Sequence, residues 1–507
     1  MSVLLFVSTT VAVGGSEEPS SSQLWGEHGE RWTVDGRLPD FSRAGYHRGE
    51  RPIPEIPQAA NVKDFGAVGD GVVDDTKAIQ AAIAATERGA IYLPPGRYKI
   101  TDFIRIEKSN IVLRGAGPER SVLSFPQGLN EVRPLASRTS DGLATTSYSF
   151  DGGFVTLQGN YQAKRLTKIT ATARRGADEV EVDGVNGIAV GQEVLVVVQE
   201  TPDQSLKTFL YSGDPGDIRR GKRFDTKMVM RVTAVHGRRV CFDRPLRFDT
   251  RPEWQPEIWS FRPTVTECGV ERLGFEFPAD PYRGHFKEKG ANAIELRKVT
   301  NCWIRNVAIR NADLGINLVA CGNTLDGIVL TADPGRGRPE AGVAECTGHH
   351  AIQCKHSEDN LITRFDVRAS YIHDLSVEHA AGNVYADGRG ADLCFDHHKD
   401  TPYENLFTDI DCGAGTRVWM NGGGDSLGRP CAGWETFWNI RAEAPIEPPP
   451  VSWGVKSMNF VGLVTKTFYF SVLEPDGWWI EVIPPERLRP RNLHAAQLAR
   501  RLSETSK

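Results

Sequence analysis

Short stretches in which apolar and polar residues alternate recur along most of the chain. In residues 374–379, Leu375 and Val377 are apolar and their neighbours are polar, and residues 392–398 show a similar pattern. Alternation with a period of two is typical of a β-strand that buries one face. The chain has 51 glycines and 30 prolines, many of them between these stretches. We therefore expect an all-β fold of short strands joined by turns.

Asparagines recur at similar spacing in the second half of the chain. Successive positions are 22, 37, 23 and 22 residues apart, and the longest step contains an additional loop at 332–339. Such intervals are typical of stacked repeats, in which each coil of the chain packs on the previous one. We expect these side chains to form a ladder between neighbouring coils. The five residues are Asn301, Asn323, Asn360, Asn383 and Asn405.

Residues 61–100 contain the most specific motif. A strand leads to a Gly-Asp-Gly turn, after which Asp74 and Asp75 precede an alanine-rich helix. Carboxylates at this place cap the first turn of a helix. The glycines and aspartates are therefore interpreted as structural residues, and neither a nucleotide loop nor a metal loop is expected here. The residues of the motif are Gly66, Gly69, Asp70, Asp74 and Asp75.

This motif resembles the opening of the pectate-lyase-like superfamily. The segments 111–118 and 121–125 resemble the next coil of the same superfamily. The resemblance covers roughly 60–160 and 265–465, and it implies a right-handed parallel β-helix with an N-terminal capping helix. Gly348-His349-His350-Ala351 and His397-His398-Lys399 also resemble a subgroup of this superfamily to which we attach no settled activity.

Changes in composition divide the chain into successive parts. Residues 1–15 form an apolar run without basic residues, a weak secretory signal that favours a secreted or periplasmic location. A misplaced start codon or a buried strand remains an alternative. The expected parts are a possible signal segment (1–15), an extended arm (16–60), coils with the capping helix (61–164), an inserted β-rich subdomain (165–250), central and C-terminal coils (251–465), and a strand with a helical tail (466–507).

Charge and cysteine content exclude several classes of protein. The 60 basic and 65 acidic residues give a net charge of −5, which argues against a nucleic-acid partner. No apolar run reaches the roughly 20 residues needed to span a membrane. The 9 cysteines include no Cys-x-x-Cys pair, which argues against a disulfide scaffold and a zinc ribbon. We expect a monomer that needs no cofactor.

Histidine is concentrated in one region. Seven of the 12 histidines lie between 349 and 398. Histidine titrates near neutral pH, so such a concentration indicates acid–base chemistry. Strand alternation places one set of side chains on an outer stripe, where equivalent positions of adjacent coils lie about 4.8 Å apart. The expected stripe is Lys355, Glu378, Asp396, His398, Arg417 and Trp419.

Other histidines are expected elsewhere. Alternation places His356 and His379 inside the coils or at their corners, and His397 can take the same position. His349 and His350 stand at a strand entrance, where a rim site and a structural turn are equally consistent with the sequence. In the extended arm, Arg43, His47 and Arg48 either anchor the arm or border a substrate cleft.

The stripe supports β-elimination on an acidic, uronate-containing polysaccharide. This reaction needs a base, for which Lys355 or His398 is suited, and a cation beside the carboxylate, for which Arg417 is suited. Similar β-helix lyases use lysine, histidine and arginine, sometimes with calcium. The candidate catalytic residues are Lys355, His398, Arg417, His397 and His350, and the candidate substrate-binding residues are His349, Glu378, Asp396, Lys399, Trp419 and Arg389.

Two other functions remain open. Glu378 and Asp396 on adjacent coils could act as the two carboxylates of a glycoside hydrolase. They could instead bind one Ca²⁺, although no clear calcium cluster is present and no metal site is expected. A non-catalytic glycan-binding protein would explain the fold but leaves the concentration of histidines unexplained.

Overall fold

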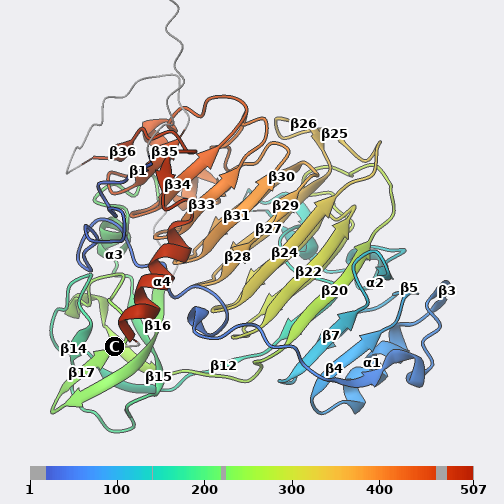
Figure 1. Cartoon of the computed structure of the whole chain (residues 1–507), viewed down its shortest axis with the longest axis horizontal. Coiled ribbons are helices and arrows are strands. Elements are labelled where there is room, and N and C mark those ends of the chain that lie inside the picture. Colours follow the sequence, from blue (N-terminus) through green and yellow to red (C-terminus); the bar gives the residue numbers. More distant parts are fainter. Residues whose placement is uncertain (1–18, 140, 219–223, 464–476, 506–507) are drawn as a thin grey trace, which may run out of the picture.

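A computed structural model describes residues 19–139, 141–218, 224–463 and 477–505. Figure 1 shows a stack of coils whose strands lie side by side in parallel sheets. The larger sheet has 16 strands: β2 (Gln58–Asn61), β3 (Asp70–Asp74), β4 (Gly89–Leu93), β5 (Gly96–Lys99), β7 (Ile111–Gly115), β8 (Ser121–Ser124), β20 (Gly269–Glu276), β22 (Trp303–Arg310), β24 (Thr324–Thr331), β28 (Leu361–Thr363), β29 (Asp366–Val367), β31 (Val384–Gly390), β33 (Leu406–Asp411), β34 (Thr436–Arg441), β35 (Asn459–Leu463) and β36 (Trp479–Glu481).

A second parallel sheet forms the other wall of the coils. From β20 to β32 its strands alternate along the chain with those of the larger sheet, except that β28 and β29 follow each other in the larger sheet. After β32 only the larger sheet gains strands. The all-β, parallel β-helix expected from the sequence is confirmed, whereas its handedness stays a prediction. The seven strands are β6 (Ile104–Ile106), β11 (Val155–Gln158), β21 (Asn292–Arg297), β23 (Leu314–Val319), β27 (Gly348–Lys355), β30 (Tyr371–Glu378) and β32 (Phe395–His397).

Apolar residues stack in register between the two walls. In the smaller sheet Ile316 pairs with Ile352, Ile352 with Leu375, and Leu375 with Phe395. All four are buried in the main core. The register is set by the pleat, because a shift of one residue would expose every one of these side chains. It therefore also determines which polar residues of the same strands face outward.

An asparagine ladder joins the coils at one corner. The Nδ2 groups of Asn323, Asn360 and Asn383 each donate to Oδ1 of the next asparagine, at 3.1, 2.9 and 3.0 Å, and Asn405 donates to Glu435 at 2.7 Å. The sequence prediction was wrong for Asn301. Its Oδ1 accepts a hydrogen bond from the backbone of the N-terminal arm, and the next residue along the chain occupies the ladder position.

Helix α1 (Thr76–Ala85) packs beside the first coils. Asp74 accepts hydrogen bonds from the backbone N–H and the hydroxyl of Thr76, while Asp75 accepts two from the turn before it. Ile79, which faces the same side as Ile83, is fully buried in the main core. Asp74 therefore holds the first residue of the helix, whereas Asp75, the N-cap residue, fixes the preceding turn and makes no capping hydrogen bond with its side chain.

The chain between the early and central coils forms an antiparallel sheet. This sheet lies beside the coils (Figure 1) and continues to Ser260, ten residues past the boundary expected from the sequence. The hydroxyls of Thr226 and Tyr403 lie 2.6 Å apart, which docks it against the coils. Its elements are β13 (Arg165–Lys168), β14 (Glu179–Glu181), β15 (Glu193–Gln199), α3 (Ser205–Leu210), β16 (Asp225–His236), β17 (Arg239–Phe242) and β18 (Glu257–Ser260).

The N-terminal arm and the C-terminal helix cover the outside of the larger sheet. Helix α4 (Leu493–Thr505) crosses this sheet in Figure 1, and Leu493 packs with Trp25 of the arm. The basic residues Arg43 and Arg48 bind Asp243. His47 binds a glutamate before β20 at 2.7 Å. The arm therefore anchors to the coils, and these three residues lie outside the cleft described below.

Short elements complete the described structure. Residues 1–15, the possible signal segment, lie outside the described residues, so export stays a prediction. Among the helices described, none is long and apolar enough to cross a membrane. The short elements are β1 (Ser20–Ser21), α2 (Leu129–Val132), β9 (Ala136–Arg138), β10 (Ala144–Thr146), β12 (Tyr161–Gln162), β19 (Arg262–Pro263), β25 (Arg338–Glu340), β26 (Val343–Cys346) and β37 (Leu488–Arg489).

Candidate active site

A cleft of about 1300 Å³ lies between the smaller sheet and the antiparallel sheet. One wall consists of residues at the ends of β27, β30 and β32, and the other includes residues of α3 and β16. Among the predicted site residues, the cleft is lined by His349, Lys355, Glu378 and His398.

Asp396 is the buried acceptor at the centre of this wall. Its carboxylate accepts hydrogen bonds from Ser376 at 2.9 Å, from His398 Nδ1 at 2.8 Å and from the backbone N–H of Gly422 at 2.6 Å. Burial opposes its ionisation, but His373 and His398 outweigh burial and hold the pKa of Asp396 well below its usual range. Asp396 is fully buried, so it orients the two histidines. The sequence suggested that it contacts substrate, and its burial does not allow this contact.

His398 is the partly exposed member of this group. Its side chain is 19% exposed and lines the cleft. Because Nδ1 is bonded to Asp396, Nε2 is the ring nitrogen left for a ligand. Burial lowers the pKa of His398, but the neighbouring Asp396 carboxylate raises it more, so the net shift is upward.

Gly422 packs directly against the rings of His398 and His373. A Cβ atom at Gly422 would lie 2.5 Å from Cε1 of His398 and 2.6 Å from Cε1 of His373. Both separations are shorter than real contacts of a Cβ atom. The segment 421–424 therefore needs glycine at 422 to approach the histidines.

Three more histidines stack behind and beside His398. The rings of His349 and His350 are 4.2 Å apart, and those of His350 and His373 are 4.8 Å apart. His350 Nδ1 lies 3.1 Å from the Ser376 hydroxyl, and the residue is buried behind the cleft wall. Burial, reinforced by neighbouring histidines, lowers the pKa of His350 well below its ordinary value. The prediction that His350 is catalytic is therefore wrong in placement.

Lys355 and Glu378 form an ion pair on adjacent coils. They are aligned in register, with Nζ and Oε2 3.4 Å apart, and both side chains are partly exposed in the cleft. Burial lowers the pKa of Lys355, but Glu378 and Asp151 outweigh burial and raise it. Lys355 is consequently a cation, and a substrate carboxylate could compete with Glu378 for it.

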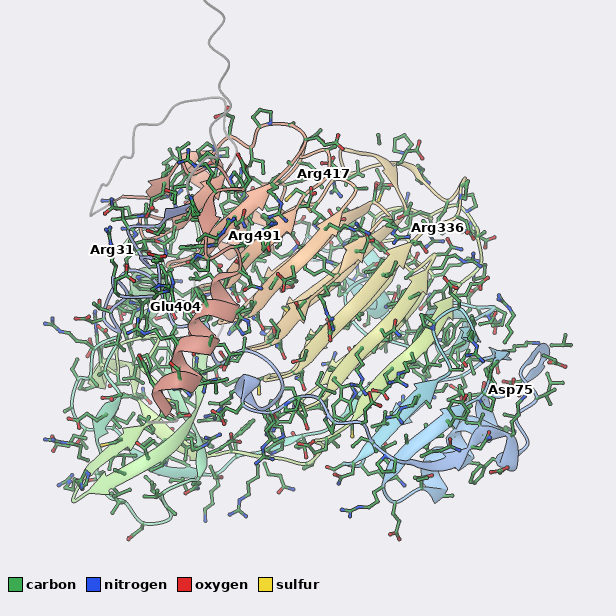
Figure 2. The ribbon with its side chains drawn as sticks, viewed as in Figure 1. Arg31, Asp75, Arg336, Glu404, Arg417 and Arg491 are labelled. Atoms are coloured by element: carbon green, nitrogen blue, oxygen red, sulfur yellow. The ribbon has the colours of Figure 1, made fainter. Side chains whose placement is uncertain are left out.

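Arg417 does not join this group. Its guanidinium binds the buried carboxylate of Asp374 and donates to the carbonyl of Ile372 at 3.3 Å. In Figure 2 it lies near the top of the view, beside the loops that connect the ends of the strands. The prediction relied on strand alternation, but residues 412–435 form a long connection between β33 and β34 with no parallel strand among them.

Two further candidates belong to the aromatic core. His397 is fully buried, with its ring 4.7 Å from that of Trp453. Trp419 donates from Nε1 to a backbone carbonyl at 2.7 Å and packs against Phe437 with ring centres 4.9 Å apart. Neither residue lines the cleft, so neither lies where it could act on a substrate bound there.

The two remaining basic candidates are paired outside the cleft. Lys399 donates to Asp425 at 2.9 Å from a turn just after β32. Arg389 is exposed on β31 in the larger sheet and donates to Asp366 at 2.7 Å. Glu378 and Asp396 lie on adjacent strands but are offset by two positions, because Asp396 pairs with Ser376. Asp396 is also fully buried, so the two carboxylates do not face the cleft side by side, and a bound Ca²⁺ stays a prediction that no observation tests.

Several cleft residues were missed by sequence reasoning. His356 and His379 follow β27 and β30 with left-handed backbone (φ 46° for both), so they lie at the corners of the coils, one of the two placements expected, and there they line the cleft. His285 lies in the turn between β20 and β21, where no alternation marks it. Lys207 and Lys227 come from the antiparallel sheet segment, and only its docking brings them near the coils.

This chain is a parallel β-helix with a histidine-rich cleft on its side, and known proteins of similar sequence or structure can be compared with it. Residues 59–164 match the family model described as "Rhamnogalacturonase A/epimerase, pectate lyase-like". The resemblance to the pectate-lyase-like superfamily noted from the sequence is thereby confirmed. The match covers the early coils and α1, whereas the cleft histidines lie further along the chain.

Curated relatives match part of the chain. It is 40% identical over 109 residues to Alginate lyase 7 of Azotobacter vinelandii, which is 20% of this chain and 12% of that protein. It is 37% identical over 109 residues to Mannuronan C5-epimerase AlgE4 of the same organism, 20% and 19% of the two chains. The chain thus spans less than a fifth of the length of these relatives.

Two solved structures are similar to this chain at low sequence identity. The tailspike protein gp49 from Pseudomonas phage LKA1 is 14% identical, with a TM-score of 0.45 over 79% of this chain and 67% of that one. The AlgE4 A-module from Azotobacter vinelandii is 12% identical, with a TM-score of 0.30 over 86% and 99% of the two chains.

Proposed function

We propose that this protein is a carbohydrate-active enzyme that removes the proton next to a uronate carboxylate and cleaves an acidic polysaccharide by β-elimination. The observation that carries the proposal is the His398–Asp396 pair, whose histidine lines the same cleft as Lys355. A histidine oriented by a buried carboxylate is a common form of general base.

The chemistry assigns one task to each group. Nε2 of His398 takes the proton from C5 of the uronate, and the electron pair left behind forms the double bond between C4 and C5. The bond from C4 to the glycosidic oxygen breaks, and that oxygen takes a proton from solvent. The ammonium group of Lys355 stabilises the negative charge that builds on the carboxylate.

The relatives support the choice of substrate class. The names alginate lyase and mannuronan C5-epimerase both refer to uronate polymers. A lyase and a C5-epimerase share the first step, removal of the C5 proton. They differ in whether the carbanion then expels the glycosidic oxygen or takes a proton back on its other face.

The carboxylates give less support to hydrolysis. A glycoside hydrolase needs two carboxyl groups that reach the scissile bond. Asp396 is fully buried and accepts three hydrogen bonds, while Glu378 is paired with Lys355. The pair considered from the sequence therefore lacks one accessible member.

A panel of uronate polymers tests the proposal. Purified protein is incubated with polymannuronate, polyguluronate and polygalacturonate, and the unsaturated product is followed by ultraviolet absorbance. We expect turnover of at least one polymer and a loss of about 10²–10⁴-fold in His398→Ala. Arg389→Ala, on the other sheet, serves as the control and should keep the wild-type rate.

Two results would count against the proposal. New reducing ends without a change in absorbance would indicate hydrolysis. Saturable binding of a polymer with no product under any condition would indicate a glycan-binding protein.

A further inference from the structure

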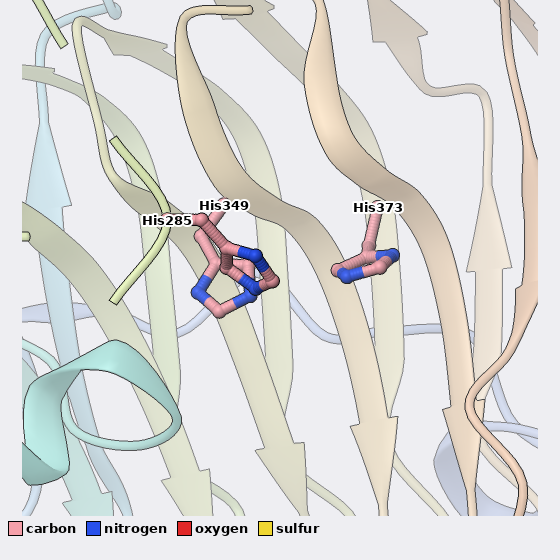
Figure 3. Close-up of side chains that lie close together, drawn as sticks. All are labelled: His285, His349 and His373. Atoms are coloured by element: carbon pink, nitrogen blue, oxygen red, sulfur yellow. The ribbon is translucent and has the colours of Figure 1, made fainter. Parts of the chain in front are cut away.

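We propose that His285, His349 and His373 form a binding site for a divalent first-row transition metal ion, with Zn²⁺ as the ion that fits the donors best. Each residue offers one ring nitrogen, and the three nitrogens lie within 4.8 Å of one another. Figure 3 shows His285 and His349 nearly superposed in view, with His373 on the adjacent strand. All three line the cleft.

Two of these rings are held by carboxylates from behind. His349 Nδ1 lies 3.2 Å from Glu288, and His373 Nδ1 lies 3.3 Å from Asp396. Both histidines are more than nine-tenths buried, and in the described structure neither Nδ1 makes a hydrogen bond of normal geometry. Histidines that bind metals usually contact such a carboxylate through their other nitrogen. This arrangement leaves Nε2 of both rings for an ion.

Glu288 is itself fixed by several donors. The hydroxyls of Ser149 and Tyr282 donate to it at 2.6 and 2.7 Å. These two donors fix the carboxylate in place against the His349 ring, which it can orient toward the cleft.

The donor set selects the kind of ion. Three imidazoles suit zinc, cobalt, nickel and copper, whereas calcium takes six to eight oxygen ligands. With Zn–N distances of about 2.0–2.1 Å, nitrogens around a tetrahedral zinc lie about 3.4 Å apart. The trio must therefore close slightly, and His285 can provide this movement because it lies in a turn. The fourth position would open into the cleft.

Two other groups of potential ligands are less suitable. In the group of His373, Asp396 and His398, the carboxylate is already occupied by Ser376 and Gly422. The group of His397, Cys431 and Glu435 is sealed in the core, and Glu435 there accepts the last hydrogen bonds of the asparagine ladder.

A metal ion would also change the charge of the cleft. The described lining holds five acidic and four basic side chains, so without charged histidines its net charge is −1, which does not attract a uronate polymer. A divalent ion beside His398 would add a second cation, besides Lys355, for the substrate carboxylate. This consequence rests on the proposed function, whereas metal binding itself does not.

Calorimetric titration of ZnCl₂ into the metal-free full-length protein tests the site. We expect one equivalent to bind with saturation, and His285→Ala to weaken binding by at least about tenfold. Glu288→Gln should weaken it by about 10–100-fold, because the orienting contact is altered. His356→Ala, in the same cleft outside the trio, should bind as the wild type does.

A second probe distinguishes the trio from adventitious sites. Co²⁺ bound by three imidazoles should give a visible absorption spectrum that disappears in His285→Ala, with circular dichroism confirming that the variant is folded. Equal binding by His285→Ala and wild type, or equally tight binding of Ca²⁺, would overturn the site. Zinc binding without turnover of any uronate would leave the site standing and overturn the proposed function alone.

Discussion

At the scale of single residues, one buried carboxylate gives two neighbouring imidazoles different properties. Asp396 faces both His373 and His398. Burial lowers the pKa of the fully enclosed His373 well below its usual value, and Asp396 does not compensate. For the partly exposed His398 the same carboxylate outweighs burial and raises the pKa. The more deeply buried ring, His373, therefore stays neutral, whereas the partly exposed ring, His398, accepts a proton readily.

Glu358 permits a stability test at the same scale. Burial, partly offset by Lys227, raises its pKa from 4.5 to about 7. Between these values the folded protein binds more protons than the unfolded chain, so stability falls as pH rises from 4.5 through 7. Glu358→Gln should remove this loss, raising the free energy of unfolding at pH 8 by up to about 3 kcal/mol. Denaturant unfolding of both proteins at pH 5 and pH 8 measures this change in the free energy of unfolding. An equal effect of the substitution at both pH values would refute the raised pKa of Glu358.

At the scale of elements, strand ends decide which polar residues reach the cleft. Within β30 and β32, alternation separates Glu378 and Asp396 from the apolar residues of their strands, but the expected exposure holds only in part for Glu378 and not for the fully buried Asp396. It failed for Arg417, because no strand exists there, and it left open the place of His356, which its left-handed backbone after β27 sets at a corner. A period-two pattern describes a strand interior and contains no information about where the strand stops.

The asparagine ladder provides a stability test at the scale of elements. Asn383 accepts from the backbone and side chain of Asn360 and donates to Ser357 and Asn405. Asn383→Ala should lower the free energy of unfolding by at least about 3 kcal/mol, since it leaves buried polar groups unpaired. Asn301→Gly, outside the ladder at a left-handed position (φ 54°), should cost about 1 kcal/mol or less. Similar losses in the two variants would contradict the ladder.

At the scale of the whole molecule, the cleft requires parts distant in sequence. The coils provide the histidine wall, and the antiparallel sheet segment provides Lys207 and Lys227 opposite it. The stacked coils could be predicted because their repeats and motif are local in sequence. The opposite wall and His285 could not, because their positions depend on docking and on a turn that no periodic pattern marks.

The central claim is that His398, oriented by Asp396, removes the proton next to a uronate carboxylate. Proton NMR of a uronate polymer turned over in D₂O tests this step directly, whichever product follows. The account predicts that the H5 signal disappears at the rate of turnover, through the unsaturated product or through deuterium incorporation, and that His398→Ala abolishes the loss. Cleavage of the polymer with H5 fully retained would contradict it.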